Sequence, residues 1–336
     1  MAITRYCAEL LEAASRYHAH YGDRLANHLP MVLIALDGLG ATREQLRHAF
    51  ERSVPHLDLR PGSPVEPVED VSTCRRREER FPSALQYYEQ QLKQHGMTDC
   101  LRRELPPLLP AIATAAFHGL IRVAYGIDAR HLEEVAMGLA YWNLEYYTLD
   151  ASNEFTDLAA AEVIEDVSRR FPQVEVAPGN ISDHMHAVTG HDGWKETPIQ
   201  PRQLGLEDIA RVALTAYRGT GDFTLLHGVT GCHALRLILP YCPDREEAMR
   251  YFWQGLVIAY LSTGPKPIVE DKLHEAGTLD HMRSWRELRS LACKSDDDHV
   301  IKLCYSCDQE YQYYDAEAYR ETACSLFSQV APAHGQ

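Results

Sequence analysis

The prediction of a helical fold starts from the stretch Ser295-Asp296-Asp297-Asp298-His299-Val300-Ile301-Lys302. Ser295 and Asp298 have the spacing of a capping box, which predicts that a helix begins here. Three consecutive carboxylates then fall in its first turn, where the helix dipole favours negative charge. His299 and Lys302 lie three residues apart, so they share one face of that helix.

Lys302 has apolar neighbours on both sides, which indicates that at least part of this turn is buried. Burial disfavours the ammonium ion and lowers the pKa of a lysine, so Lys302 is a candidate reactive amine or metal ligand beside His299. The simpler interpretation is a lysine whose stem crosses the edge of the core and whose ammonium pairs with Asp297 or Asp298. The spacing alone leaves both interpretations open.

Composition excludes several classes of protein. The chain has 336 residues, of which 33 are basic and 48 acidic, and its net charge of -15 argues against nucleic acid or an anionic membrane as partner. No apolar run reaches the ~18 residues that a membrane span needs, and no signal-peptide segment is visible. Nine scattered cysteines suit free thiols in a reducing compartment. We therefore expect a soluble, cytoplasmic protein.

Apolar residues recur at helical spacing along the whole chain. Residues 53–70, which are rich in proline, and the irregular stretch 171–201 are the predicted loops. No alternating strand pattern and no internal repeat is present. The sequence therefore predicts an all-α, single-domain helical bundle over residues 1–336, with helices in 10–17, 30–36, 42–50, 83–95, 111–121, 128–146, 157–170, 206–217, 222–240, 244–261, 295–303 and 315–327.

Five of the 17 histidines lie in or beside strongly apolar segments: His28, His118, His227, His233 and His299. A single buried histidine is usually a core residue with its hydrogen bonds satisfied. Five in four such segments instead suggest a buried metal site, because helix bundles build such sites from side chains of several helices. Neutral imidazoles favour zinc, iron, copper or nickel.

Other candidate ligands are less convincing. His227 and His233 are about 240° apart around a regular helix, so one of them, rather than both, is expected to face a site. Cys304 and Cys307 form one C-x-x-C without a second pair, which is more typical of packing than of zinc. The pair His184 and His186 is similar to metal sites that follow a barrel strand. Here it lies in a predicted loop, and we expect no metal there.

Four motifs are similar to those of the questin oxidase-like family, and together they extend from residue 27 to residue 302. The family includes fungal enzymes that open a ring of anthraquinones and related aromatic polyketides, described as Baeyer-Villiger-type or ring-cleaving oxygenases. The motifs are Asn27-His28-Leu29-Pro30 with Leu39-Gly40-Ala41, Phe117-His118-Gly119-Leu120-Ile121 with Tyr125-Gly126-Ile127, His227-Gly228-Val229-Thr230, and Asp298-His299-Val300-Ile301-Lys302.

The resemblance implies an all-helical fold around one non-haem Fe(II). Carried over by motif, it implies that the metal ligands are His28, His118, His227, His299 and a Lys302 carboxylated by CO2. His233 matches no family ligand and is expected at most behind them. The chain departs from fungal members at Gly119 and Arg122, where they tend to have a proline and a second histidine. It is also shorter, and both differences bear on the substrate.

The chemistry of these residues agrees with the resemblance. A buried Lys302 can react with CO2 as the neutral amine, and the resulting carbamate supplies an anionic oxygen ligand. Four imidazoles and one anion leave Fe(II) an open position for O2. The aromatic residues Trp142, Tyr146 and Tyr147 are candidates to line a flat pocket, or simply to pack the core.

The first hypothesis is therefore an iron-dependent oxygenase that opens a ring of an aromatic, polyketide-like small molecule. A metal-dependent hydrolase is the alternative enzyme, since histidines and a carboxylated lysine also suit zinc and an activated water. A non-catalytic helical binding protein is the third interpretation. Some family members are described as using NADPH, but the chain has no GxGxxG or other nucleotide motif. The substrate and the oligomeric state are left open.

Overall fold

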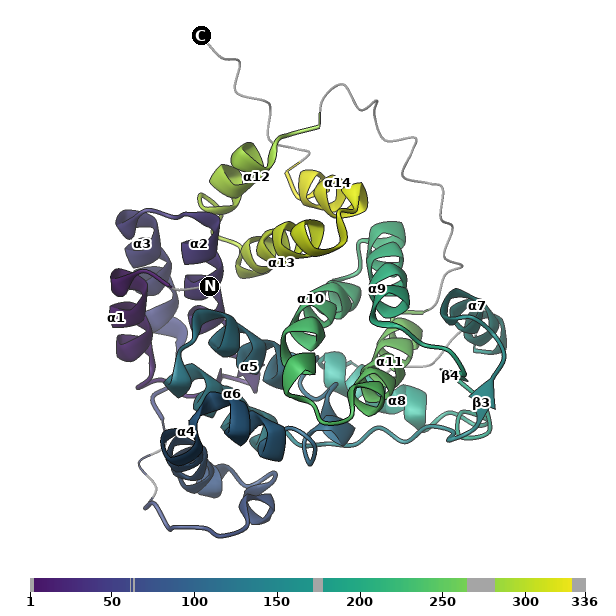
Figure 1. The fold of residues 1–336 in the computed structure, drawn as a ribbon, viewed down its shortest axis with the longest axis horizontal. Coiled ribbons are helices and arrows are strands. Elements are labelled where there is room, and N and C mark those ends of the chain that lie inside the picture. The colour runs from purple at the N-terminus through teal and green to yellow at the C-terminus, as the bar shows by residue number, and fades with distance from the viewer. Residues whose placement is uncertain (1–2, 61, 63, 172–177, 265–281, 328–336) are drawn as a thin grey trace.

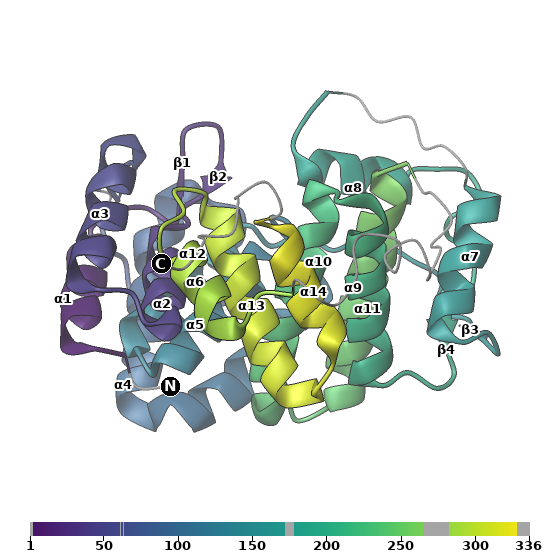
Figure 2. The same ribbon diagram turned by 90° about the horizontal axis from the view of Figure 1, so that it is seen from above.

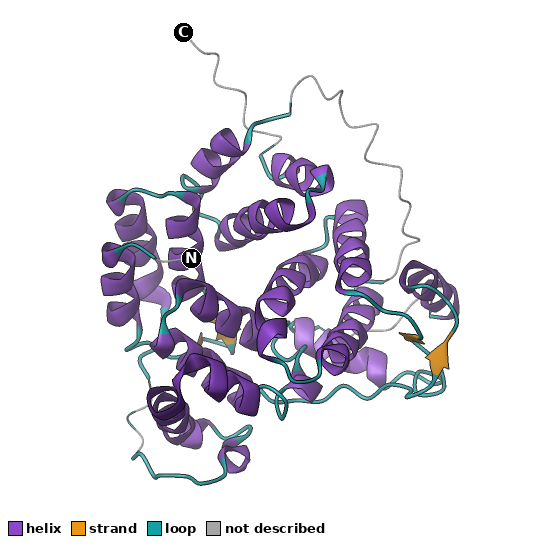
Figure 3. Ribbon diagram, in the orientation of Figure 1, coloured by secondary structure: helices purple, strands orange, loops and turns teal. Residues whose placement is uncertain are grey.

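The computed structural model describes residues 3–60, 62, 64–171, 178–264 and 282–327. This part of the chain consists of helices and connecting loops, with two small two-stranded sheets (Figure 3). The prediction of an all-α fold is confirmed. Within the described residues, no helix has both the length and the apolar character that crossing a membrane requires.

Three helices lie together at the N-terminal end of the molecule (Figures 1 and 2). They are α1 (Arg5–Ala14), α2 (Leu29–Leu39) and α3 (Arg43–Ser53), with an antiparallel hairpin of β1 (His20–Tyr21) and β2 (Leu25–Ala26) between α1 and α2. Pro30 stands in the first turn of α2 and His28 directly before it. Thr42 and Gln45 form a capping box at the start of α3, because the side chain of each accepts the backbone N–H of the other.

The next group is α4 (Phe81–Glu104), α5 (His118–Ala129) and α6 (Leu132–Leu144). Gly96 breaks α4 with φ 74° and ψ 168°, directly after the helix predicted for residues 83–95, and helix then resumes to Glu104. α5 and α6 pack closely, and a Cβ added to Gly126 would lie only 2.7 Å from the backbone nitrogen of Val135. The helix predicted for residues 128–146 begins later than expected, since His131 caps α6 and its Nδ1 accepts from the backbone N–H of Glu134.

The continuous helix predicted for residues 111–121 is also wrong. A 3₁₀ turn spans Leu109–Ala111, and α5 begins only at His118. The three residues before it, Ala115, Ala116 and Phe117, have φ of 49°, 53° and 65° and form a left-handed turn. Such a conformation is unfavourable for residues other than glycine, so the surrounding structure must impose it.

Five helices form the opposite end of the molecule (Figure 2). They are α7 (Ala160–Arg170), α8 (Ile181–Thr189), α9 (Leu206–Thr220), α10 (Phe223–Ile238) and α11 (Arg245–Ser262), with β3 (Phe155–Thr156) parallel to β4 (Gln200–Pro201). The prediction that 171–201 is an irregular loop is corrected by α8, while residues 172–177 lie outside the described residues. The other predicted loop, 53–70, holds a 3₁₀ turn at Val54–His56 and is otherwise irregular where described.

The last three helices are α12 (Trp285–Ala292), which the sequence did not predict, α13 (Asp298–Tyr314) and α14 (Glu317–Ser325). α13 packs against both α2 and α10 and so joins the two ends of the molecule (Figure 1). Its predicted cap at Ser295 is wrong by two residues. Asp297 is the cap, with Oδ1 accepting from the backbone N–H groups of His299 at 2.8 Å and Val300 at 3.2 Å, and Asp298 alone is acidic in the first turn.

Candidate metal centre

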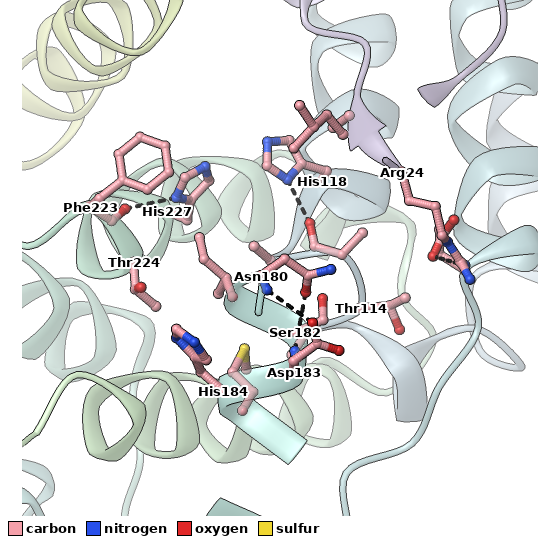
Figure 4. A pocket seen from close by; sticks show the side chains of 18 of the residues that line it. Arg24, Thr114, His118, Asn180, Ser182, Asp183, His184, Phe223, Thr224 and His227 are labelled. Atoms are coloured by element: carbon pink, nitrogen blue, oxygen red, sulfur yellow. Dashed lines mark hydrogen bonds and ion pairs between the residues drawn. The ribbon is translucent and has the colours of Figure 1, made fainter. Parts of the chain in front are cut away.

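Four of the five singled-out histidines converge at one place, although they come from four different helices. His28 precedes α2, His118 begins α5, and His227 and His299 belong to α10 and α13. Their ring centroids form a closed circuit with separations of 4.9, 4.8, 5.2 and 4.6 Å. Figure 4 shows His118 and His227 side by side at the wall of a pocket. We call this group the four central histidines.

Each of these rings has an oxygen atom on its Nδ1 side. The left-handed turn before α5 places the carbonyl oxygen of Ala115 at 2.5 Å from Nδ1 of His118. In α10, Nδ1 of His227 lies 2.9 Å from the carbonyl oxygen of Phe223. These contacts favour the tautomer with the proton on Nδ1, which leaves the Nε2 lone pair free toward the centre.

Carboxylates take the same position for the other two rings. Nδ1 of His28 lies 3.8 Å from Oδ2 of Asp298, and Nδ1 of His299 lies 3.9 Å from Oδ1 of Asp297. These distances are too long for direct hydrogen bonds, but the negative charge of each carboxylate still attracts a ring N–H. The ligand nitrogens of His28, His118 and His299 lie within 4.8 Å of one another, whereas His227 joins this group through its ring contacts with His118 and His299.

Two of the four Nε2 atoms lack the partners that buried nitrogens normally have. Nε2 of His227 and Nε2 of His299 are buried without a hydrogen-bond partner among the described residues, which costs ~1–3 kcal/mol for each atom. Nε2 of His28 and Nε2 of His118 are 2.8 Å apart, a hydrogen bond when one of the two rings carries its proton on Nε2. A metal ion that prefers imidazole ligands would satisfy the two unpartnered nitrogens, so the donor set fits such an ion.

Burial lowers the pKa of every central histidine and so keeps the rings neutral at physiological pH. The pKa of His299 falls to about 3, through burial first and then the charge of Lys302. The pKa values of His28, His118 and His227 are also well below the ordinary range, with burial as the main cause and Lys302 contributing to each. Neutral imidazole is the form that binds metal.

Lys302 lies one helical turn after His299 and is only 2% exposed. Burial lowers its pKa from 10.5 to about 7, although the charges of Asp298 and Asp297 act in the opposite direction. Among the described residues Lys302 makes no ion pair, so the interpretation of a lysine paired with one of these aspartates is wrong. Asp298 pairs instead with Arg52 of α3, which leaves the amine of Lys302 beside the four central histidines.

The four central histidines lie on one wall of an open cleft of about 1660 Å³. The opposite wall is α8, which contributes Asp183 and His184, and Arg24 lies at a third side (Figure 4). The ring of Phe223 is 53% exposed and lies 4.5 Å from the ring of His299. The cleft therefore combines an aromatic surface beside the histidines with polar groups across from them.

Sequence reasoning missed the α8 wall because 171–201 was taken as a loop. The signal was present, since Asn180 and Asp183 form a capping box with side-chain to backbone distances of 3.1 and 2.9 Å. His184 of the discounted pair lies on this wall of the cleft but belongs to none of the metal-ligand groups of the described residues. His186 of the same pair packs its ring 3.7 Å from the ring of Tyr147.

Of the three aromatic residues suggested for the pocket, only one lies there. Tyr147 lines the cleft. Trp142 is fully buried in the core, where its Nε1–H donates to the carbonyl oxygen of Ala111 at 2.9 Å. Tyr146 lies under the guanidinium of Arg75, 3.7 Å from its carbon.

His233 points away from the cleft, as the rotation between it and His227 predicts. Its Nδ1 lies 3.1 Å from Oγ of Ser306, and its ring packs against Tyr125 and Tyr305. The buried cysteines Cys304 and Cys307 are free thiols.

Comparison with known proteins bears on this arrangement. The model of the questin oxidase-like family matches residues 25–307 of the 336-residue chain. That range contains all four central histidines and Lys302. Among curated proteins, no match to the chain was found. From the extent of the family match, the chain belongs to the questin oxidase-like family.

Proposed function

We propose that the protein is a non-haem iron oxygenase that opens a ring of an aromatic, polyketide-like small molecule. Membership of the questin oxidase-like family supports an oxygenase-type activity on such compounds. The observation that carries the metal is the pair of buried Nε2 atoms of His227 and His299, which have no hydrogen-bond partner among the described residues and lie beside His28 and His118. A shared cation would satisfy these nitrogens.

In this proposal the four central histidines hold the metal and Lys302 supplies an anionic ligand. The neutral amine of Lys302 attacks the carbon of CO2, an N–C bond forms, and one proton leaves to solvent. A pKa of about 7 makes the neutral amine available at physiological pH. Fe(II) bound here would supply the activation of O2. The protein residues position the substrate and limit access of water.

The cleft supports a flat substrate. The exposed ring of Phe223 lies next to the rings of His227 and His299, so an aromatic substrate stacked on it would lie beside the metal. Across the cleft, Asp183, His184 and Arg24 offer hydrogen-bonding groups to ring hydroxyl or keto oxygens. This combination of an apolar surface and a few polar groups is typical of small-molecule sites.

Elemental analysis of the purified protein tests the metal. We expect about one iron per chain in the wild type, and loss of most of it in His299→Ala and in Lys302→Ala. His233→Ala is the matched control, because His233 is a buried histidine of α10 that faces away from the cleft. Its iron content should equal that of the wild type. If the wild type contains no iron after incubation with Fe(II) and bicarbonate, the proposal is contradicted.

Oxygen consumption tests the reaction. Hydroxylated anthraquinones should stimulate O2 uptake by the iron-loaded protein, and ring-opened products should appear by mass spectrometry. Measurements with and without NADPH decide whether an external reductant is consumed. Zinc at the four central histidines, with hydrolytic products and no O2 uptake, would favour the metal-dependent hydrolase instead.

A further inference from the structure

A second group of metal-ligating side chains lies outside the cleft. It consists of His18, which lies two residues before β1, His20, which is the first residue of β1, and Glu78 of the 3₁₀ turn Glu78–Arg80 that precedes α4. Nε2 of His18 lies 2.8 Å from Oε1 of Glu78, and Nε2 of His20 lies 3.0 Å from Oε2. One carboxylate therefore meets two imidazoles, each through a different oxygen.

The contact of His18 does not have the geometry of a hydrogen bond. Its Nε2 is buried and has no hydrogen-bond partner among the described residues, although Oε1 of Glu78 is only 2.8 Å away. The oxygen thus lies off the line along which a ring N–H points. The side chain of His18 is 3% exposed, so water does not replace the missing partner from bulk solvent. A buried nitrogen in this state needs another ligand.

We infer that His18, His20 and Glu78 form a second metal site, which binds Zn²⁺ and is separate from the four central histidines. Two imidazoles and one carboxylate are a ligand set that zinc accepts in tetrahedral geometry. The side chain of Glu78 is 51% exposed, so a water molecule can supply the fourth ligand from the solvent side. The inference does not depend on the proposed oxygenase function.

Zinc binding at this site would change which ring nitrogen of His18 carries the proton. Nδ1 of His18 accepts the backbone N–H of His20 at 3.3 Å, which places the ring proton on Nε2 in the free protein. Zinc on Nε2 requires the other neutral tautomer, with the proton on Nδ1. That long contact is then lost, and a metal–nitrogen bond replaces it. The tautomer of His18 is therefore a direct readout of occupancy.

The site is connected to the segment that carries His28. The carbonyl oxygen of His18 accepts from Nδ2 of Asn27 at 2.9 Å, and Oδ1 of Asn27 accepts the backbone N–H of Leu29 at 3.1 Å. Asn27 thus joins His18 to the first turn of α2, next to His28. Zinc would hold the base of the β1–β2 hairpin against the turn before α4, and so stabilise the N-terminal wall of the cleft.

Zinc stoichiometry tests the inference. Metal-stripped wild type, Glu78→Gln and His227→Ala are equilibrated with Zn²⁺, desalted and subjected to elemental analysis. We expect about two zinc ions per chain in the wild type and about one in each variant. Equal zinc content in Glu78→Gln and the wild type would overturn the second site. If His227→Ala equals the wild type while Glu78→Gln loses its zinc, the second site stands and zinc binding at the central histidines does not require His227.

Two further measurements protect this result from a folding artefact. Circular dichroism should show the same helix content in Glu78→Gln and the wild type. NMR of the histidine ring nitrogens should show His18 changing from the Nε2–H to the Nδ1–H tautomer when Zn²⁺ is added to His227→Ala. A His18 spectrum that Zn²⁺ leaves unchanged would show that the three residues form only an ion-paired group.

Discussion

The Nδ1 atom of each central histidine has an oxygen beside it, and none of these four contacts was predicted from the sequence. Asp297 and Asp298 directly precede His299 in the chain, but Asp298 lies beside His28, which is far away in sequence. The other two oxygens are backbone carbonyls of Ala115 and Phe223. The motifs predicted which histidines belong together. They did not predict what orients the rings.

The pairing of Asp298 shows why sequence reasoning about Lys302 stopped at two alternatives. Asp298 and Lys302 are four residues apart on one helix, a spacing that often gives an ion pair. In the structure, Arg52 of α3 takes Asp298 instead. The guanidinium of Arg52 belongs to another helix, and local sequence spacing does not predict such a long-range contact. The lysine is thereby left without a counterion in a buried position, where its pKa falls to about 7.

Replacing Lys302 by alanine should remove the anionic ligand but leave a space that a small carboxylate can enter. We expect Lys302→Ala to bind iron at least tenfold more weakly than the wild type, and acetate or propionate at millimolar concentration to restore part of the affinity. Titration with Fe(II) under anaerobic conditions measures both. In Lys302→Met the side chain fills the space, and restoration there would contradict the role of a carboxylated lysine.

Lys302 should also make the stability of the metal-free protein depend on pH. Its pKa is about 7 when folded and 10.5 ordinarily, so above pH 7 the unfolded chain binds more protons than the folded protein. The free energy of unfolding should therefore rise by about 1–2 kcal/mol between pH 7 and 8.5. Urea unfolding in CO2-free buffer measures this. Lys302→Met should lack the rise, and an identical slope in both proteins would contradict it.

At the scale of the helices, α13 is capped by a different residue from the one that the sequence pattern predicted. The capping box predicted from Ser295 and Asp298 is absent because Asp297 accepts the N–H groups of His299 and Val300. Asp297→Ala should lower the free energy of unfolding by about 1 kcal/mol and weaken iron binding, because it loosens the turn that carries His299. Ser295→Ala, the control, should change both less. Chemical denaturation and Fe(II) titration give the comparison, and a larger effect at Ser295 would restore the sequence prediction.

The contact between α5 and α6 depends on glycine. A Cβ on Gly126 would lie 2.7 Å from the backbone nitrogen of Val135, and backbone cannot move aside cheaply. Gly126→Ala should therefore destabilise the protein by about 1–3 kcal/mol. Gly219 of α9 is the control, because its position is open, and alanine there should stabilise by about 0.5–1 kcal/mol. Thermal unfolding compares the two variants, and equal melting temperatures would refute the close contact.

Most helices could be predicted from apolar periodicity, but the left-handed turn before α5 could not. Ala115 and Ala116 favour right-handed helix by intrinsic propensity. Their conformation costs ~1–2 kcal/mol per residue and persists only because packing imposes it. The turn delivers the carbonyl oxygen of Ala115 to His118. Local preference thus gives way at a residue of the candidate site, where such conflicts are expected.

At the scale of the whole molecule, the cleft is built from segments that are distant in sequence. The β1–β2 hairpin, the left-handed turn, α8, and the N-terminal ends of α10 and α13 all contribute to its walls. Composition and periodicity predicted the helices but not their arrangement, because that depends on side-chain contacts between distant segments. The histidines could be grouped in advance only through the family motifs.

Substrate binding tests the cleft as a unit. A tricyclic hydroxyquinone should bind the metal-free protein, and Phe223→Ala should weaken that binding about five- to tenfold through loss of ring stacking worth ~1–1.5 kcal/mol. Phe155→Ala is the control, because that phenylalanine is 46% exposed but outside the cleft. Calorimetric titration measures the affinities. Equal weakening by the two variants would place the ligand elsewhere.

The spread of the four central histidines along the chain has a consequence for biosynthesis. His28 leaves the ribosome long before His299 and Lys302 do. The four central histidines can therefore come together only after α13 has been synthesised and has packed against α2 and α10. Until then the set of ligands of the proposed metal centre is incomplete. Loading of the centre should thus be a late event in maturation, after α13 has docked.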